Sequence, residues 1–342
     1  MKYVYLSLFL LFSASGIHLR AQDLHFTQNH FPSIYFNPAQ TGAFYGTYRV
    51  NALYRDQNRS FFGTAYQTPI LTIDSPIVFG FRPNHWVGAG VTLFNDQAGE
   101  QGYSSTGFLG SLAYHLGLDK KMKNVLTLGV RYGFVSRSIN SDGGKFGDEL
   151  AGLSSSPDRN LIMDFNDGYS SLSVGAMFKS KISKAVSFEV GAAGIHLIAG
   201  TYTFMMSNAL NESSLRLNGH ANLNIQVSDQ LALAPTVYYS NESTSNNLVV
   251  QVNSAFRIKK MKKGDKKEPF TLYPGIGMRM GDALQFMLGA KVNKYKVGIA
   301  YDYSINDYNS FTTSGAFEVG IQRIFEIKKK PEIKPIIFCP RL

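Results

Sequence analysis

The chain has 342 residues, of which 44% are hydrophobic, 13% aromatic and 17% charged, and its formal net charge is +10. Soluble domains carry about 25% charged residues, so the charge content is low for that class. The mean hydropathy of −0.10 excludes a polytopic helical membrane protein, and the apolar content excludes a disordered chain. What remains is an all-β protein, or a membrane protein whose hydrophobicity is hidden by alternation along its strands.

The first 21 residues have the features of a secretory signal peptide. Lys2 supplies the positive start, residues 4–12 form a short apolar run, and small residues follow up to Ala21. A single transmembrane anchor is less favoured, because a spanning helix needs about 18 apolar residues. No cysteine lies near the cleavage region, which excludes a lipoprotein, and the sole cysteine, Cys339, cannot form a disulfide within the chain. The sequence therefore predicts an exported protein with a signal peptide over residues 1–21.

Residues 22–46 differ from the rest of the mature chain. The stretch 23–44 is aromatic, is punctuated by Pro32 and Pro38, and does not alternate between apolar and polar residues. We expect this segment to plug the lumen of a barrel or to cap its periplasmic mouth.

Residues 215–227 give the clearest strand pattern. The odd positions are apolar or small throughout, and the even positions are polar. A helix would spread these polar groups around its surface, whereas a strand places them on one face. The polar face is predicted to line a lumen and consists of Arg216, Asn218, His220, Asn222, Asn224 and Gln226.

Two architectures produce such two-faced strands, a large soluble sandwich and a membrane barrel. Sandwich strands are mostly about 5–6 residues long, whereas strands that cross a membrane need about 9–11. Several patterns here are long, and Tyr295 lies at the opposite end of one outward face from Tyr301 and Tyr303, as aromatic girdles require. We therefore favour an all-β, transmembrane antiparallel barrel over residues 47–325.

The patterns predict fourteen strands, an even number that is typical of bacterial single-chain barrels. The second strand could be two strands broken at Pro69. An even count places both termini on the periplasmic side. The predicted strands are 47–56, 60–75, 86–95, 104–116, 124–138, 168–182, 185–197, 214–228, 230–241, 247–259, 270–280, 283–292, 294–304 and 313–325.

The connections then differ in charge between the two sides. The predicted periplasmic connections include residues 118–123, 181–184 and 259–269, the last with six lysines. The predicted external connection 139–168 holds six acidic residues. Either both sides are simply solvated, or the basic periplasmic turns meet an acidic partner or the cell-wall layer.

Signals for chemistry are scarce. Six histidines remain after signal removal, none in an HExxH arrangement, and no second cysteine is available for a zinc site. A surface hydrolase would need a Ser–His pair, for which His196 with Ser207 or Ser213 is the best available choice. We predict no enzymatic activity, no metal, no cofactor and no nucleic-acid partner.

The last residues, 326–342, form a basic tail. Residues 328–342 read KKKPEIKPIIFCPRL, which combines lysines, prolines and an apolar tip. Such a composition suits an extended peptide that is held by a partner, and the alternative is a disordered tail.

Motifs near both ends of the mature chain resemble the PorP/SprF family of outer-membrane proteins, which is associated with type IX secretion and gliding in Bacteroidetes. After Gln22-Asp23 come His25-Phe26-Thr27-Gln28 and Asn37-Pro38-Ala39-Gln40-Thr41-Gly42, and then Tyr54-Arg55-Asp56-Gln57. Tyr301-Asp302-Tyr303-Ser304-Ile305 leads to Ser314-Gly315-Ala316-Phe317-Glu318-Val319, and the chain ends in Cys339-Pro340-Arg341-Leu342. The departures are Asp56 without a following Trp, Phe317 where a His is common, and Leu342 in place of an aromatic residue.

The resemblance implies a fourteen-stranded barrel that binds the secretion or gliding machinery, or holds an exported protein at the cell surface. It implies no enzyme. The alternative function is a diffusion channel for small or hydrophobic solutes. The residues expected to bind partners are Asn37, Pro38, Thr41 and Gly42 near the start and Lys328, Lys329, Lys330, Cys339, Pro340 and Arg341 in the tail.

Overall fold

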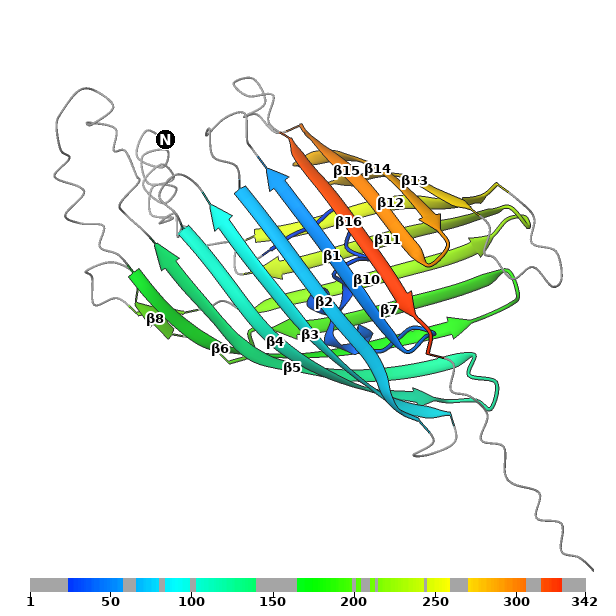
Figure 1. Cartoon of the computed structure of the whole chain (residues 1–342), viewed down its shortest axis with the longest axis horizontal. Helices are drawn as coiled ribbons and strands as arrows, with labels where there is room; N and C mark the ends of the chain where they lie inside the picture. The colour runs from blue at the N-terminus through cyan, green and yellow to red at the C-terminus, as the bar shows by residue number, and fades with distance from the viewer. Residues whose placement is uncertain are drawn as a thin grey trace, which may run out of the picture.

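Fourteen antiparallel strands close into a barrel in the computed structural model of the chain (Figure 1). The structure describes residues 24–57, 66–79, 84–98, 103–139, 165–198, 201–203, 210–212, 215–242, 245–258, 270–305 and 315–327. The closed sheet confirms the barrel and excludes the soluble sandwich. The barrel strands are β1 (Tyr48–Gln57), β2 (Tyr66–Phe79), β3 (His85–Ala98), β4 (Tyr103–Gly117), β5 (Asn124–Ile139), β6 (Phe165–Lys181), β7 (Val186–Ile195), β10 (Arg216–Gln226), β11 (Leu231–Glu242), β12 (Ser245–Arg257), β13 (Thr271–Arg279), β14 (Ala283–Val292), β15 (Tyr295–Ser304) and β16 (Ala316–Phe325).

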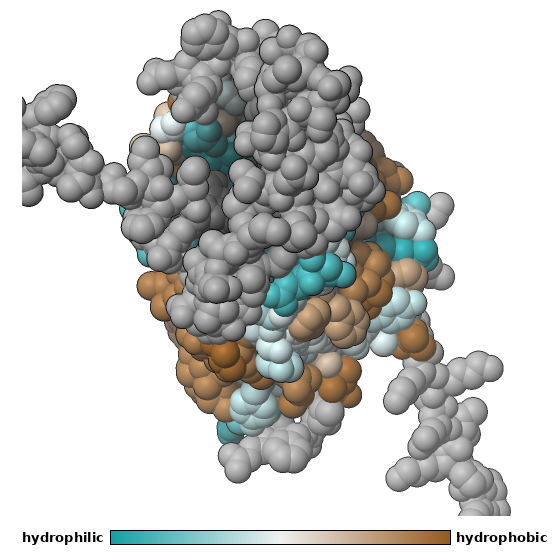
Figure 2. Space-filling model, turned by 90° about the vertical axis from the view of Figure 1, so that its left-hand side faces the viewer, coloured by the Kyte–Doolittle hydropathy of each residue, from teal (hydrophilic) through white to brown (hydrophobic). Residues whose placement is uncertain are grey.

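The strands alternate as their sequences predict, with apolar side chains outside and mostly polar side chains inside, where a few apolar ones such as Leu53 and Phe94 are also buried. On β5, Leu128 and Tyr132 are 59% and 57% exposed, whereas Thr127 and Arg131 are 0% and 1% exposed. Figure 2 shows apolar side chains gathered on the outer wall. This distribution is the reverse of that in a soluble protein and matches a barrel whose outer face meets lipid. None of the helices in the described residues has the length and apolar character to cross a membrane.

The second strand is single, as in the predicted set of fourteen, and begins and ends later than predicted. β2 is one strand that runs through Pro69, so the alternative of two strands broken at this proline is wrong. Pro69 points outward and pairs with Tyr54 of β1, and the irregularity of the strand lies later, between Pro76 and Val78, where the register against β3 shifts. A bulge accommodates a proline in a strand without ending it.

The two ends of the barrel differ in their connections. At one end β16 finishes at Phe325 beside Tyr48, and short connections such as 182–185 and 293–294 join the strands. We call this the β16 end. The two longest connections, 140–164 and 196–215, lie at the other end, which we call the loop end. The 196–215 connection includes a small two-stranded sheet, β8 (Thr201–Thr203) and β9 (Leu210–Glu212).

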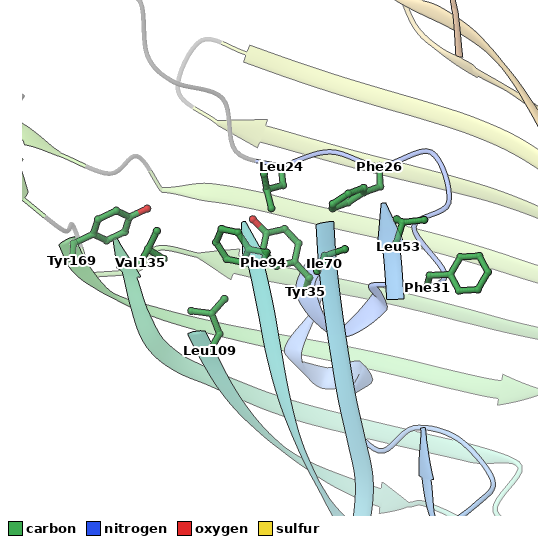
Figure 3. Close-up of a cluster of buried hydrophobic side chains, with 10 residues drawn as sticks. All are labelled: Leu24, Phe26, Phe31, Tyr35, Leu53, Ile70, Phe94, Leu109, Val135 and Tyr169. Carbon is green, nitrogen blue, oxygen red and sulfur yellow. The ribbon is translucent and has the colours of Figure 1, made fainter. Parts of the chain in front are cut away.

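Residues 24–42 lie inside the barrel, and we call them the lumenal segment (Figure 1). The segment contains a single-turn helix, α2 (Ser33–Phe36), followed by a 3₁₀ turn, η1 (Pro38–Gln40). Its apolar side chains form a core with the inner wall, mainly with strands β1 to β6 (Figure 3). From the segment come Leu24, Phe26, Phe31 and Tyr35, and from the wall Leu53, Ile70, Phe94, Leu109, Val135 and Tyr169.

The described ends of the chain lie at opposite ends of the barrel. The carbonyl of Leu24 accepts a hydrogen bond from Arg216, the first residue of β10, at the loop end. The main-chain N–H of Ile327 bonds to Thr47 just before β1, at the β16 end. The prediction that both termini lie on the periplasmic side concerns residues outside the described part of the chain. That prediction rests on the strand count, which takes no account of a segment that runs through the lumen.

Candidate functional site

Thr27 lies in a buried charged cluster near the loop end. Its N–H and that of Gln28 donate to the two oxygens of Glu318, at 2.7 and 2.9 Å, and its hydroxyl donates to Asp302 at 2.5 Å. A carboxylate that accepts two consecutive main-chain N–H groups holds an extended chain in one position. This stretch of the lumenal segment is therefore fixed to β15 and β16.

Two arginines neutralise these carboxylates. Arg55 contacts Glu318 at 2.6 Å and Asp302 at 3.1 Å, and Arg279 contacts Asp302 at 3.1 Å. All four side chains are nearly inaccessible to solvent. Removing one partner of a buried ion pair costs about 3–5 kcal/mol, because it leaves an uncompensated charge. We call Thr27 and these four residues the Thr27 cluster.

Wall side chains hold the middle of the segment through its carbonyl groups. Arg131 donates to the carbonyls of Ile34, at 3.4 Å, and of Tyr35, and Asn218 donates to that of Phe36 at 3.0 Å. These carbonyls lie at the end of α2, where no further helical turn can satisfy them. The wall therefore recognises main-chain groups of the segment.

Asn37 joins the two short helices to the wall. Its side-chain oxygen accepts from the N–H of Ala39 and caps η1, while its Nδ2 donates to the carbonyls of Ala176 and Ala192 on β6 and β7. An added Cβ at Gly175 would lie 2.1 Å from the Asn37 oxygen. A glycine at this wall position is what permits the close approach.

A second buried cluster holds the segment where it approaches the β16 end. The N–H of Gly42 donates to Asp74 at 2.8 Å, and Asp74 pairs with Arg49. Nε2 of His115 donates to the Thr41 carbonyl at 2.8 Å, which assigns the proton to that nitrogen. Gly42 has a φ of +70°, which favours glycine.

The predicted site residues near the start of the chain face the barrel wall. Asn37, Pro38 and Thr41 are buried, and their described contacts and those of Gly42 are within the chain. That these four residues also contact partner proteins remains a prediction. The predicted tail residues Lys328, Lys329, Lys330, Cys339, Pro340 and Arg341 lie outside the described residues, as does the signal peptide.

The predicted row on β10 lies on the inner face. Arg216 and Asn218 contact the segment, and His220 lies 3.3 Å from Gln40 and 3.5 Å from Glu189. Further along the strand, Asn222 bonds to Thr236, and Gln226 donates to the carbonyls of Ser228 and Leu231, while Asn224 is exposed.

Several charged wall residues that hydrogen-bond to the segment were not predicted as site residues, among them Arg49, Arg55, Asp74, Arg131, Asp302 and Glu318. The available signal was a charge at an inward position of an alternating strand. Such a residue needs a partner when the lumen is filled.

A small cavity lies between the segment and the wall near the loop end. Its lining includes Phe26 and Asn29 of the segment and Arg216, Tyr238 and Asn247 of the wall. The side-chain oxygens of Asn29 and Asn247 are buried and have no hydrogen-bond partner among the described residues. These two oxygens can accept hydrogen bonds from water or from a bound molecule.

The described residues offer little for catalysis. Nδ1 of His196 lies 2.8 Å from the Ser171 hydroxyl, whereas Ser207 and Ser213 of the hydrolase hypothesis lie outside the described residues. No group of three or more metal-binding side chains occurs in the part of the chain that the structure describes.

A family model described as type IX secretion system membrane protein PorP/SprF matches residues 19–322. No curated protein matches the sequence significantly. Among solved structures, the toluene transporter TbuX of Ralstonia pickettii is 11% identical, with 86% of this chain and 94% of that chain covered and a TM-score of 0.49. The translocator domain of the autotransporter NalP from Neisseria meningitidis is 10% identical, with 87% and 94% covered and a TM-score of 0.44. We draw no function from these two similarities.

Proposed function

The chain belongs to the PorP/SprF family of type IX secretion system membrane proteins, and we propose that it is a non-catalytic outer-membrane barrel that binds this machinery and holds an exported protein at the cell surface. The observation that carries the proposal is the occupied lumen. The segment is bonded to the wall from Leu24 to Gly42, which favours a rigid scaffold with binding surfaces at its two ends.

The two ends would serve different partners. Outer-membrane barrels have short periplasmic turns and longer external loops, so the loop end would face outward. The exported protein would then meet the loop end, and the basic tail after β16 would meet periplasmic parts of the machinery.

The diffusion channel is the less favoured function. Wide barrels of about 16–18 strands leave an aqueous channel, and a barrel of fourteen strands needs a plug to close it. The lumenal segment would be that plug. Its aromatic core packs against strands β1 to β6, and its polar groups bond to the remaining wall.

Deletion of residues 328–342 tests the role of the tail. We expect the barrel to assemble, as judged by heat-modifiable migration in gels, and the type IX machinery proteins to be lost from the purified complex. A matched variant that keeps the tail but replaces Lys328, Lys329 and Lys330 with glutamine separates its charge from its apolar tip. Co-purification that is unchanged by the deletion would overturn the role of the tail.

A further inference from the structure

The lumenal segment runs the full way from one end of the barrel to the other. It leaves the lumen at the β16 end, where the N–H of Thr47 donates to the carbonyl of Phe325 and the carbonyl of Gly42 accepts from Trp86, the second residue of β3. At the other extreme, Leu24 is bonded to Arg216, which pairs with Glu242, the last residue of β11. The described segment therefore starts at the loop end.

The intermediate contacts follow the same order. Glu318, which binds Thr27, is the third residue of β16 and thus lies near the loop end. Asp302 lies two residues before the end of β15, at the same level. Asn37 contacts the middle parts of β6 and β7. The direction of the segment thus rests on independent contacts with several strands.

Only two residues separate Leu24 from the expected cleavage site after residue 21. Two extended residues span at most about 7 Å, which is far less than the length of the barrel wall. A mature chain that begins at Gln22 cannot return its first residue to the β16 end while Leu24 keeps its contact with Arg216.

We propose that the N-terminal end of the lumenal segment, at Leu24, lies at the outer surface of the cell, on the opposite side of the membrane from Ile327 after β16. The inference deepens the proposed function and uses its assignment of the loop end to the exterior. The start of the segment and the neighbouring cavity then belong to the surface that an exported polypeptide meets.

Single-cysteine labelling tests this topology in a Cys339→Ser background. Asp23→Cys reports on the N-terminal end, Met280→Cys on the turn between β13 and β14 at the loop end, and Lys294→Cys on the turn between β14 and β15 at the β16 end. Intact cells are treated with a membrane-impermeant maleimide. We expect Asp23→Cys and Met280→Cys to be labelled, and Lys294→Cys to be labelled only after the outer membrane is permeabilised.

If Asp23→Cys, like Lys294→Cys, is labelled only after the outer membrane is permeabilised, the inference is overturned. If Met280→Cys and Lys294→Cys exchange their behaviour, the orientation in the proposed function is wrong, as is external exposure of the N-terminal end. An epitope inserted between Gln22 and Asp23 gives a second readout if the cysteine is unreactive in the folded protein. Antibody binding to intact cells supports the inference, and binding only after permeabilisation contradicts it.

Discussion

Thr27 shows at the scale of one residue how the lumen holds its segment. The residue is bonded to side chains of five strands, namely β1, β12, β14, β15 and β16, through its main chain and its hydroxyl. These partners are as far as 291 positions away in the sequence. The hydroxyl both donates to Asp302 and accepts from Gln285, so a buried charge and a buried amide depend on one side chain.

We expect Thr27→Val to loosen the segment and to leave the barrel intact. A hydrogen bond to a charged group contributes about 1.5–3 kcal/mol, so amide-exchange protection of residues 27–36 should fall by about 10- to 100-fold. Asp302 keeps Arg55 and Arg279, so its charge stays paired. Hydrogen exchange read by mass spectrometry measures the change.

The matched control for that experiment is Thr68→Val. Thr68 also donates to a carboxylate, that of Asp96 at 2.5 Å, but this pair lies on the wall between β2 and β3. The control should leave the protection of the segment unchanged. Equal losses in both variants would show that the Thr27 cluster has no special role.

We expect His30 to make the docking of the segment dependent on pH. Burial lowers the pKa of His30 well below its usual value, and the charge of Lys296 lowers it further. An undocked His30 binds a proton below a pH of about 6.5, whereas the docked residue does not. The docked state is therefore unaffected above this pH and loses stability as the pH falls below it.

We expect protection of the segment against chymotrypsin to be lower at pH 5.5 than at pH 7.5, two values chosen on either side of the ordinary histidine pKa of about 6.5. His30→Gln should remove the difference, because glutamine does not titrate. A difference of the same size in His30→Gln would assign the effect to another group.

At the scale of the element, the strands and the segment differ in how far the sequence predicts them. Each barrel strand carries its own signal, because alternation fixes which side chains face outward, and the fourteen predicted ranges overlap the fourteen strands of the barrel. The segment carries no such period. Its place depends on wall groups such as Arg131 and Glu318 that bind its main chain, and main-chain recognition leaves little trace in the sequence of the bound segment.

The place of the segment does leave one trace in the sequence of the wall, namely inward-facing glycines that let the segment approach closely. A Cβ added at Gly129 of β5 would lie 2.4 Å from the N–H nitrogen of Ala39, whereas one added at Gly219 of β10 would meet nothing within 4 Å. Both glycines occupy strands, but only Gly129 faces the segment. The contrast gives a matched pair of substitutions.

We expect Gly129→Ala to displace the η1 turn from the wall and Gly219→Ala to have no effect on the segment. Overpacking of this kind costs about 1–3 kcal/mol. The expected result is faster chymotrypsin cleavage near Tyr35 and Phe36 in Gly129→Ala, with normal heat-modifiable migration in both variants. Equal cleavage rates in the two variants would contradict the close packing of the segment on β5.

At the scale of the whole molecule, the barrel places its apolar residues outside and a polar wall around a segment of its own chain. The alternation in the sequence predicts the apolar outer face, because lipid-facing and lumen-facing side chains alternate along each strand. It does not predict how the lumen is filled. An empty polar lumen and a filled one share the outward apolar positions. The difference lies in inward apolar residues such as Leu53 and Phe94 and in a few buried charges such as Asp302.

Deletion of residues 24–44 should therefore convert a closed barrel into an open one. The wall charges keep partners after the deletion, because Arg49 stays beside Asp74, and Arg55 and Arg279 stay beside Asp302. We expect the full-length protein to be silent in planar bilayers and the deletion variant to conduct ions. A synthetic peptide of residues 22–44 should block that conductance by reoccupying the wall sites, and a scrambled peptide of the same composition should not. Equal conductance of the full-length protein and the deletion variant would show that the segment does not close the lumen, and would favour the diffusion channel.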